Sequence, residues 1–162
     1  MSGSMTQDVK IVQAESVSQI DDARTIFREY EAWIDFDLCF QGFEAELASL
    51  PGKYSKPDGR LLLAYVDDRL AGCIAMRKLE DGICEMKRLF VRDEFRGLRI
   101  GINLIERLIA DAREIGYSKM RLDTFPPKMS KAVSLYETHG FVEIPPYYEN
   151  PHSDVLFMEL SL

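Results

Sequence analysis

Hydrophobic residues recur along this chain with two spacings, one typical of amphipathic helices and one typical of strands. Within residues 18–33 they recur every three or four positions, and Ser18 is the predicted N-cap. Residues 105–115 repeat this period and end at Gly116, a residue type that favours helix ends. Residues 43–50 and 128–139 give two further helices. The expected inner positions are Ile20, Ala23, Ile26, Phe27 and Tyr30 in the first helix, Ile105, Leu108, Ile109, Ala112 and Ile115 in the third, and Ala132, Leu135 and Tyr136 in the last.

Short apolar runs bounded by turn residues predict the strands. They are expected at residues 9–14, 61–66, 70–77, 83–91, 119–124, 141–144 and 155–160, with a breaker-rich loop at 50–59. Strands two, three and four are separated only by short turns, so they should form an antiparallel meander. This order predicts an α/β fold, with a mixed but mostly antiparallel sheet of about seven strands flanked by about four helices.

Length and composition fit one globular domain. The chain has 162 residues, of which 46% are hydrophobic and 29% charged. We assign residues 9–162 to this domain and expect residues 1–8 to be a disordered start or a cloning remnant. Because neither a signal peptide nor an apolar run of about 20 residues is visible, we expect a cytoplasmic protein that binds no membrane. We expect it to be a monomer or a homodimer.

The net charge of −7 argues against a nucleic-acid partner, but the charge is unevenly distributed. Residues 14–50 hold nine acids and two bases, whereas residues 85–131 hold eleven bases and seven acids. Two interpretations remain open. The charged residues either form solvated helix faces, or they place an anionic ligand on one side and a cationic substrate on the other.

The cysteines and histidines do not indicate a metal site. Cys39, Cys73 and Cys84 are odd in number, lack a C-x-x-C spacing and lie in apolar contexts, which favours buried free thiols. His139 and His152 are isolated in the sequence. We therefore expect no metal.

A basic, glycine-containing turn follows the fourth strand and has the properties of an anion site. It consists of Arg96, Gly97, Leu98, Arg99, Ile100 and Gly101, and it opens a helix whose first amide groups lack partners. The spacing excludes the two common nucleotide-binding turns, G-x-G-x-x-G and G-x-x-x-x-G-K-[S/T].

The turn resembles the acyl-CoA-binding motif of the GNAT acetyltransferases, Q/R-x-x-G-x-G/A, with Arg99 in place of the middle glycine. A second stretch, beginning at Ala132 and ending at Phe141, resembles the family's A-x-x-L-Y-x-x-x-G-F. Met129 stands where many members have asparagine. The resemblance spans residues 9–160 and implies the GNAT fold, with acetyl-CoA as cosubstrate and transfer of its acetyl group to the primary amine of a small molecule by direct transfer in a ternary complex.

The resemblance also implies residues that contact acetyl-CoA. These are the turn from Arg96 to Gly101, the strand residues Leu89, Phe90 and Val91, and Met129 and Ala132 of the last helix. Apolar residues at 84 and 86 and then at 89 and 91 predict a β-bulge, which would free backbone N–H groups for the thioester and pantetheine. An exposed edge strand without a bulge is the alternative.

Two residues are candidates for proton transfer, since an amine attacks a thioester only when neutral. Glu85 matches the glutamate that acts as general base in several GNAT enzymes, and ion pairing with Lys87, Arg77 or Arg88 is the alternative role. Tyr136 matches the tyrosine that protonates the leaving thiolate, although helical spacing also suits it to core packing.

The acceptor is the least determined part of the site. Glu31, Arg77, Tyr147 and Tyr148 are the candidate substrate-binding residues, because the family's acceptor enters near the first helices and the proline-rich segment 145–151. The two tyrosines either form an aromatic wall for an ammonium group or only close the core. A protein lysine or N-terminus as acceptor, and an acyl-CoA-binding module without turnover, remain alternatives.

Overall fold

The computed structural model describes residues 8–34, 42–151 and 153–162. Its elements are β1 (Val9–Gln13), α1 (Val17–Ile34), α2 (Phe43–Ser49), the 3-10 turn η3 (Gly52–Tyr54), β2 (Arg60–Val66), β3 (Arg69–Glu80), β4 (Ile83–Val91), the 3-10 turn η4 (Asp93–Phe95), α3 (Ile100–Ile115), β5 (Lys119–Thr124), α4 (Pro126–Thr138), β6 (Val142–Ile144) and β7 (Leu156–Ser161). The predicted disordered start therefore lies almost wholly outside the described residues, as do Cys39 and His152.

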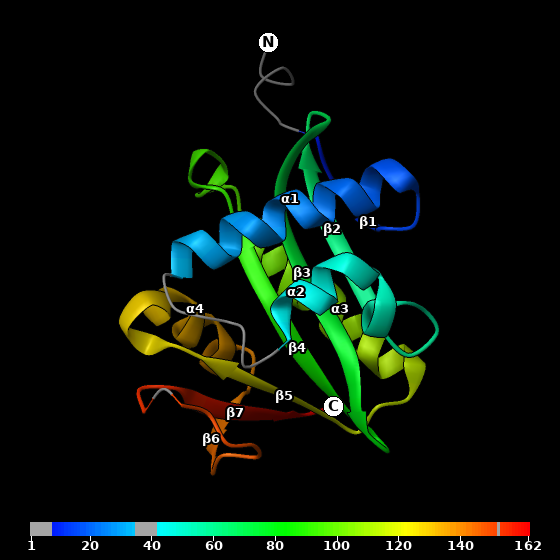
Figure 1. The fold of residues 1–162 in the computed structure, drawn as a ribbon. Helices are drawn as coiled ribbons and strands as arrows, with labels where there is room; N and C mark the ends of the chain where they lie inside the picture. The colour runs from blue at the N-terminus through cyan, green and yellow to red at the C-terminus, as the bar shows by residue number, and fades with distance from the viewer. Residues whose placement is uncertain (1–7, 35–41, 152) are drawn as a thin grey trace.

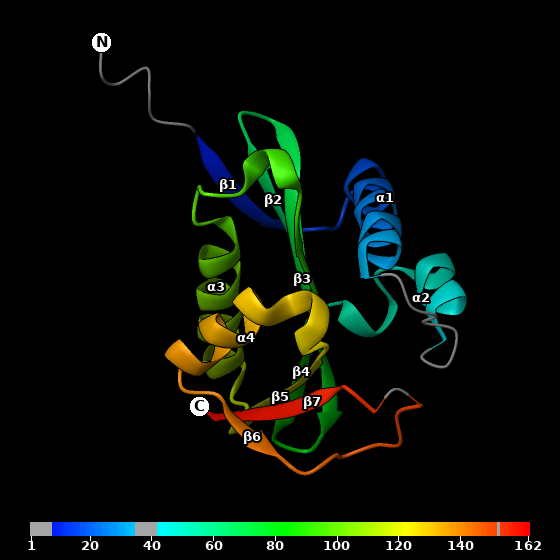
Figure 2. The same cartoon turned by 90° about the vertical axis from the view of Figure 1, so that its left-hand side faces the viewer.

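The strands form one seven-stranded sheet in the order β1-β2-β3-β4-β5-β7-β6 (Figure 1). All neighbouring strands are antiparallel except β4 and β5, which are parallel. The predicted meander is β2, β3 and β4. Figure 2 shows α1 and α2 on one face of this sheet and α3 and α4 on the other. The predicted fold class is therefore confirmed.

Two hydrophobic clusters cover the two faces of the sheet. Alternation in β2 divides its side chains, since Leu62 and Ala64 join the cluster under α3 while Leu61 and Leu63 join the cluster under α1. The five predicted inner positions of α1 are buried, and so are those of α3 except Ile115, which is partly buried against the core. Helical periodicity therefore identified these core faces correctly.

Some predicted boundaries and caps were wrong. Helix α1 is capped by Ser16, not Ser18, because the Ser16 hydroxyl accepts a hydrogen bond from the Gln19 N–H at 3.2 Å and the Gln19 side chain accepts one from the Ser16 N–H. This reciprocal pair is a capping box. Strand β3 extends to Glu80, which the sequence had placed in a turn. The predicted loop 50–59 contains η3, whose Tyr54 is fully buried.

The remaining general expectations concern cysteines and membranes. Cys73 and Cys84 are buried free thiols, as predicted, and burial raises the pKa of Cys84 to about 12. Among the described helices, none is long and apolar enough to cross a membrane.

A candidate acetyl-transfer site between two diverging strands

The site begins where β4 and β5 separate. The two strands pair only at residues 83–85 of β4, which lie opposite residues 119–121 of β5. Beyond this point they diverge, and the gap opens toward α4 (Figure 1). β5 therefore does not pair with the second half of β4.

A β-bulge interrupts β4 inside this opening. Cys73 faces Phe90 while Ala75 faces Lys87, so two residues of β4, Arg88 and Leu89, stand opposite a single residue of β3. Arg88 has a φ of 63°, in the left-handed region. The predicted bulge is therefore confirmed, and the alternative of an exposed edge strand is wrong.

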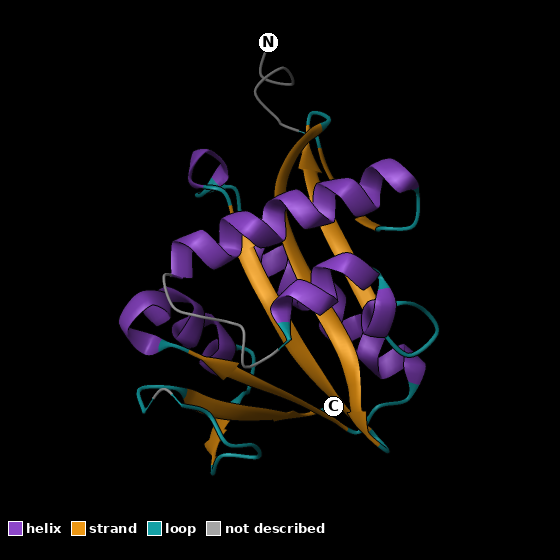
Figure 3. Ribbon diagram, in the orientation of Figure 1, coloured by secondary structure: helices purple, strands orange, loops and turns teal. Residues whose placement is uncertain are grey.

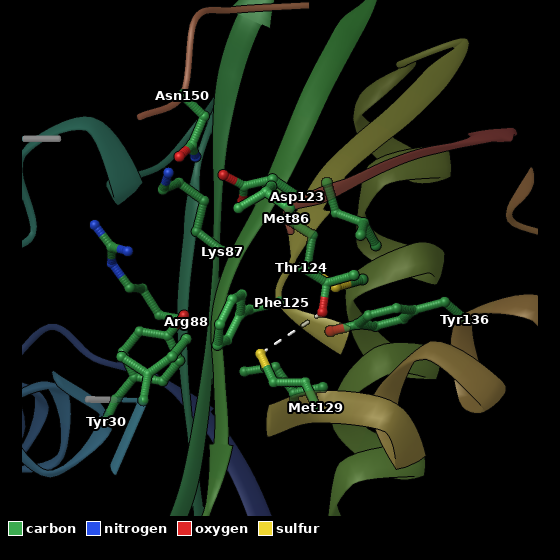
Figure 4. Close-up of a pocket in the computed structure, with 14 residues that line it drawn as sticks. Tyr30, Met86, Lys87, Arg88, Asp123, Thr124, Phe125, Met129, Tyr136 and Asn150 are labelled. Atoms are coloured by element: carbon green, nitrogen blue, oxygen red, sulfur yellow. Dashed lines mark hydrogen bonds between the residues drawn. The ribbon is translucent and has the colours of Figure 1, made fainter. Parts of the chain in front are cut away.

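A pocket occupies the opening, and Figure 4 shows its lining from both helical layers and the sheet. Lys87, Asp123 and Asn150 gather at one end, whereas Thr124, Met129 and Tyr136 gather at the other. The lining residues are Tyr30, Ile34, Met86, Lys87, Arg88, Leu89, Leu122, Asp123, Thr124, Phe125, Met129, Tyr136, Asn150 and Val155. The pocket thus has a charged end and a mostly apolar end.

Glu85 lies buried at the point where β4 and β5 part, with 1% of its surface exposed. Its carboxylate accepts hydrogen bonds from Arg77 Nε at 2.8 Å and from the Tyr147 hydroxyl at 2.7 Å, and Lys87 Nζ lies 3.8 Å away. Burial tends to raise the pKa of this carboxyl, but the charges of Lys87 and Arg77 and the two hydrogen bonds outweigh it and lower the pKa below 4.5. Glu85 is therefore a carboxylate at neutral pH, paired with two of the three predicted cations.

Tyr136 belongs to both the core and the pocket. It is 3% exposed and packs against Phe141, with ring centroids 5.7 Å apart. Its hydroxyl points toward Thr124 and Met129 at the apolar end of the pocket (Figure 4). Burial raises the pKa of this phenol well above its usual value of 10, so it is protonated at neutral pH.

The turn after β4 has the geometry of an anion cradle. Helix α3 begins at Ile100, four residues after the predicted opening at Arg96, and Gly101 lies in its first turn. Gly97 has a φ of 89° with open space where a Cβ would project, and Arg99 has a φ of 62°. Arg96 forms an ion pair with Asp93 at 3.1 Å and lies over the Trp33 ring. The turn therefore presents the N-terminus of α3, whose first amides have no intrahelical partner, beside open space at Gly97, an arrangement that suits an anion.

Comparison with known proteins identifies the family of this chain. The model of the acetyltransferase (GNAT) family matches residues 20–141. The chain belongs to the GNAT family. It is 38% identical to an uncharacterized N-acetyltransferase of Dictyostelium discoideum, over 95% of this chain and 99% of that protein. It is also 38% identical to an uncharacterized N-acetyltransferase of Schizosaccharomyces pombe, over 96% of each chain. The protein is therefore an N-acetyltransferase.

Solved structures show the same fold. A GNAT acetyltransferase from Staphylococcus aureus superposes with a TM-score of 0.78 at 20% identity, covering 95% of this chain and 99% of that one. The PaiA N-acetyltransferase of Thermoplasma acidophilum, solved in complex with coenzyme A, superposes with a TM-score of 0.72 at 19% identity, covering 96% and 99%. GNAT structures with this fold therefore include a coenzyme A complex.

The candidate acceptor residues of this GNAT enzyme do not all lie together. Tyr147 binds Glu85 and the Tyr148 hydroxyl binds the Asp123 carboxylate, while both tyrosine rings pack on Phe157. The tyrosines thus close the core and also hold two carboxylates. Glu31 is outside the pocket lining and forms an ion pair with Arg28 at 3.2 Å.

Asp123 and Asn150 are pocket residues that the sequence reasoning missed. Asn150 donates to the Tyr148 hydroxyl at 2.8 Å, which joins it to Asp123. The position of Asp123 near the end of a predicted strand, before a loop, was the one available signal. Their meeting depends on the segment between β6 and β7, whose described residues form loops and turns (Figure 3).

Proposed function

We propose that this N-acetyltransferase transfers the acetyl group of acetyl-CoA to the primary amine of a small molecule, by direct transfer in a ternary complex. The observation that carries this proposal is the opening between β4 and β5, where the bulged strand and the Tyr136 phenol line one pocket and the Glu85 carboxylate is buried where the two strands part. Such an arrangement favours catalysis by positioning two substrates against each other.

The cradle and the bulged strand are the proposed acetyl-CoA site. Backbone groups of Leu89, Phe90 and Val91 bind the pantetheine arm and the thioester oxygen, because no β5 residue pairs with them. The turn from Arg96 to Gly101 binds the diphosphate. Met129 lines the pocket and Ala132 is partly buried against both hydrophobic clusters, so both are placed to contact the pantetheine from α4.

Glu85 and Tyr136 have opposite protonation states, which suits opposite roles. The acceptor amine forms the new N–C bond to the acetyl carbon as the C–S bond breaks, and it loses one proton to Glu85 directly or through water. Tyr136 returns a proton to the thiolate sulfur. At neutral pH the lowered pKa of Glu85 leaves it deprotonated and the raised pKa of Tyr136 leaves it protonated, the resting states that these two roles require.

A small acceptor is favoured by the residues that crowd the charged end of the pocket. Lys87, Asp123 and Asn150 gather there, the Tyr148 hydroxyl is hydrogen-bonded to Asp123 and Asn150, and the Tyr147 and Tyr148 rings pack on Phe157. Arg77 and Tyr147, which hold Glu85, are the proposed neighbours of the acceptor amine. A protein segment would need an open groove here.

A thiol-release assay tests this function. Purified protein is given acetyl-CoA with a panel of primary amines, and free coenzyme A and acetylated product are both measured. We expect at least one amine to give acetylated product. The amount of product should equal the thiol released in excess of the hydrolysis measured without amine. Thiol release that no amine increases, or acetylation only of peptide lysines or N-termini, would reject a small-molecule acceptor.

A further inference from the structure

Glu46 and Arg88 form a buried ion pair directly at the β4 bulge. Arg88 Nε donates to Glu46 Oε2 at 3.0 Å and Arg88 Nη2 donates to Oε1 at 2.9 Å, a two-point geometry specific to arginine and carboxylate. Each side chain is only 2% exposed. The pair therefore holds its partners in one relative orientation, because neither can turn to water without leaving a buried charge behind.

The pair connects α2 with the bulge of β4. Glu46 belongs to α2, which has only seven residues and no side-chain cap at its N-terminus, whereas Arg88 is the bulged residue of β4. The guanidinium also lies over the rings of Tyr30 and Phe43, at 5.8 and 5.1 Å from their centroids. Arg88 is thus fixed by α1 and α2 together.

The backbone of Arg88 needs the support of these contacts. Arg88 adopts a φ of 63°, which is unfavourable for a residue other than glycine. Its carbonyl also accepts a hydrogen bond from the Cys73 thiol at 3.1 Å. Strained conformations persist where surrounding contacts determine them, and they concentrate at functional sites. The next residue is Leu89, whose N–H is the proposed thioester donor.

We propose that Glu46 and Arg88 are positioning residues for acetyl transfer. The pair holds the bulge so that the Leu89 N–H faces the thioester oxygen, and it acts through that backbone group. This inference rests on the proposed function, and it adds a role for α2 that the candidate site does not contain.

The test compares Glu46→Gln with Glu29→Gln. Glu29 is the matched control, because it also forms a two-point pair, with Arg92 at 2.7 and 2.8 Å, joining α1 to the residue just after β4, away from the bulge. For Glu46→Gln we expect kcat to fall at least tenfold with the KM for acetyl-CoA within twofold, since a displacement of about 1 Å can reduce a rate by about 10². For Glu29→Gln we expect kcat within twofold of the parent.

A second variant separates the side chain from the backbone. Arg88→Gly relieves the strain but removes the ion pair, so we expect the same fall in kcat as for Glu46→Gln. If glycine alone supports the active bulge, Arg88→Gly will retain full kcat and the proposal is wrong. Equal losses in Glu46→Gln and Glu29→Gln would also overturn it, and so would failure of both Glu46→Gln and Arg88→Gly to fold at 10 °C.

Amide chemical shifts of the ligand-free protein make this test independent of the proposed function. In Glu46→Gln we expect the Leu89 and Arg88 amide resonances to move while those of β7 stay in place, and Glu29→Gln should leave the bulge resonances unchanged. Unmoved bulge resonances in Glu46→Gln reject the positioning role whatever the enzyme's acceptor is. Lack of turnover in the parent with any amine would instead count against the proposed function.

Discussion

At the residue scale, two arginines occupy positions where the backbone favours glycine. Arg88 and Arg99 both have φ values near 60°, which costs roughly 1 kcal/mol or more for a residue with a Cβ. For Arg88 the ion pair with Glu46 offsets this cost. For Arg99 the φ of 62° explains in physical terms why glycine is usual at this point of the family motif, and an arginine adds positive charge where a diphosphate is proposed to bind.

Glu85 carries the first prediction at this scale. Because Glu85→Gln keeps the volume but removes the base, we expect turnover at pH 7 to fall by about 10² to 10⁴, with acetyl-CoA affinity little changed. The pKa of Glu85 is lowered, so the parent keeps its base above that pKa and loses it below. The variant should therefore lack the decline in kcat/KM that the parent shows as the pH falls below 4.5.

The control is another paired glutamate of the same sheet. Glu159 of β7 accepts a hydrogen bond from Arg121 at 2.9 Å, and β5 lies between it and β4. Glu159→Gln should retain turnover within a few-fold. If Glu85→Gln retains full turnover as well, Glu85 has only the structural role of pairing with Arg77 and Lys87.

At the scale of elements, the proposed acetyl-CoA site has two walls, the start of α3 and the second half of β4. The turn brings free amides to the end of β4, and the separation of β5 exposes the edge of β4 beside it. Gly101 is the residue where this geometry can be tested without a clash, because a Cβ added there meets only Val91, at an ordinary distance of 3.8 Å.

We predict that Gly101→Glu weakens acetyl-CoA binding at least tenfold relative to Gly101→Gln. Both substitutions add similar volume, but only the glutamate brings negative charge to the proposed diphosphate site. Calorimetric titration at two salt concentrations measures the difference, which should shrink as salt screens the charges. Equal affinities of the two folded variants would show that the diphosphate binds elsewhere.

At the scale of the whole molecule, the uneven charge distribution is partly neutralised inside the fold. Glu46 and Glu29 come from the acidic segment 14–50, and they pair with Arg88 and Arg92 of the basic segment 85–131. Neither interpretation of the sequence foresaw this arrangement. Much of the asymmetry thus attaches the first two helices to β4.

Stability should depend on pH through the buried carboxylates of Glu46 and Glu85. Burial alone would raise the pKa of Glu46, but its hydrogen bonds to Arg88 and the neighbouring charges lower it below 4.5, as for Glu85. A carboxyl with a lowered folded-state pKa stabilises the fold above 4.5, and this contribution is lost as the pH falls through the folded-state pKa. We therefore expect the free energy of unfolding to decrease steadily below about pH 4.5.

Urea unfolding at several pH values measures this dependence. Glu46→Gln should be less stable than the parent at pH 7 and should lose less stability on acidification, because one titrating group is gone. Glu44→Gln is the exposed control and should change stability little at either pH, since water and salt screen its pair with Arg28. A parallel decline in parent and Glu46→Gln would show that Glu46 contributes nothing to acid sensitivity.

The sequence by itself determined the order of the elements, the apolar faces of α1 and α3, and the bulge in β4. These features are local, since periodicity reports which side of a helix or strand faces the core and a change of parity reports an extra residue. The tertiary structure alone decided the rest. Glu46 meets Arg88 across 42 residues, Tyr147 meets Glu85 across 62, and Asp123 meets Tyr148 across 25. Such partners depend on how β4 and β5 diverge and how the helices pack, which no local pattern of residues records.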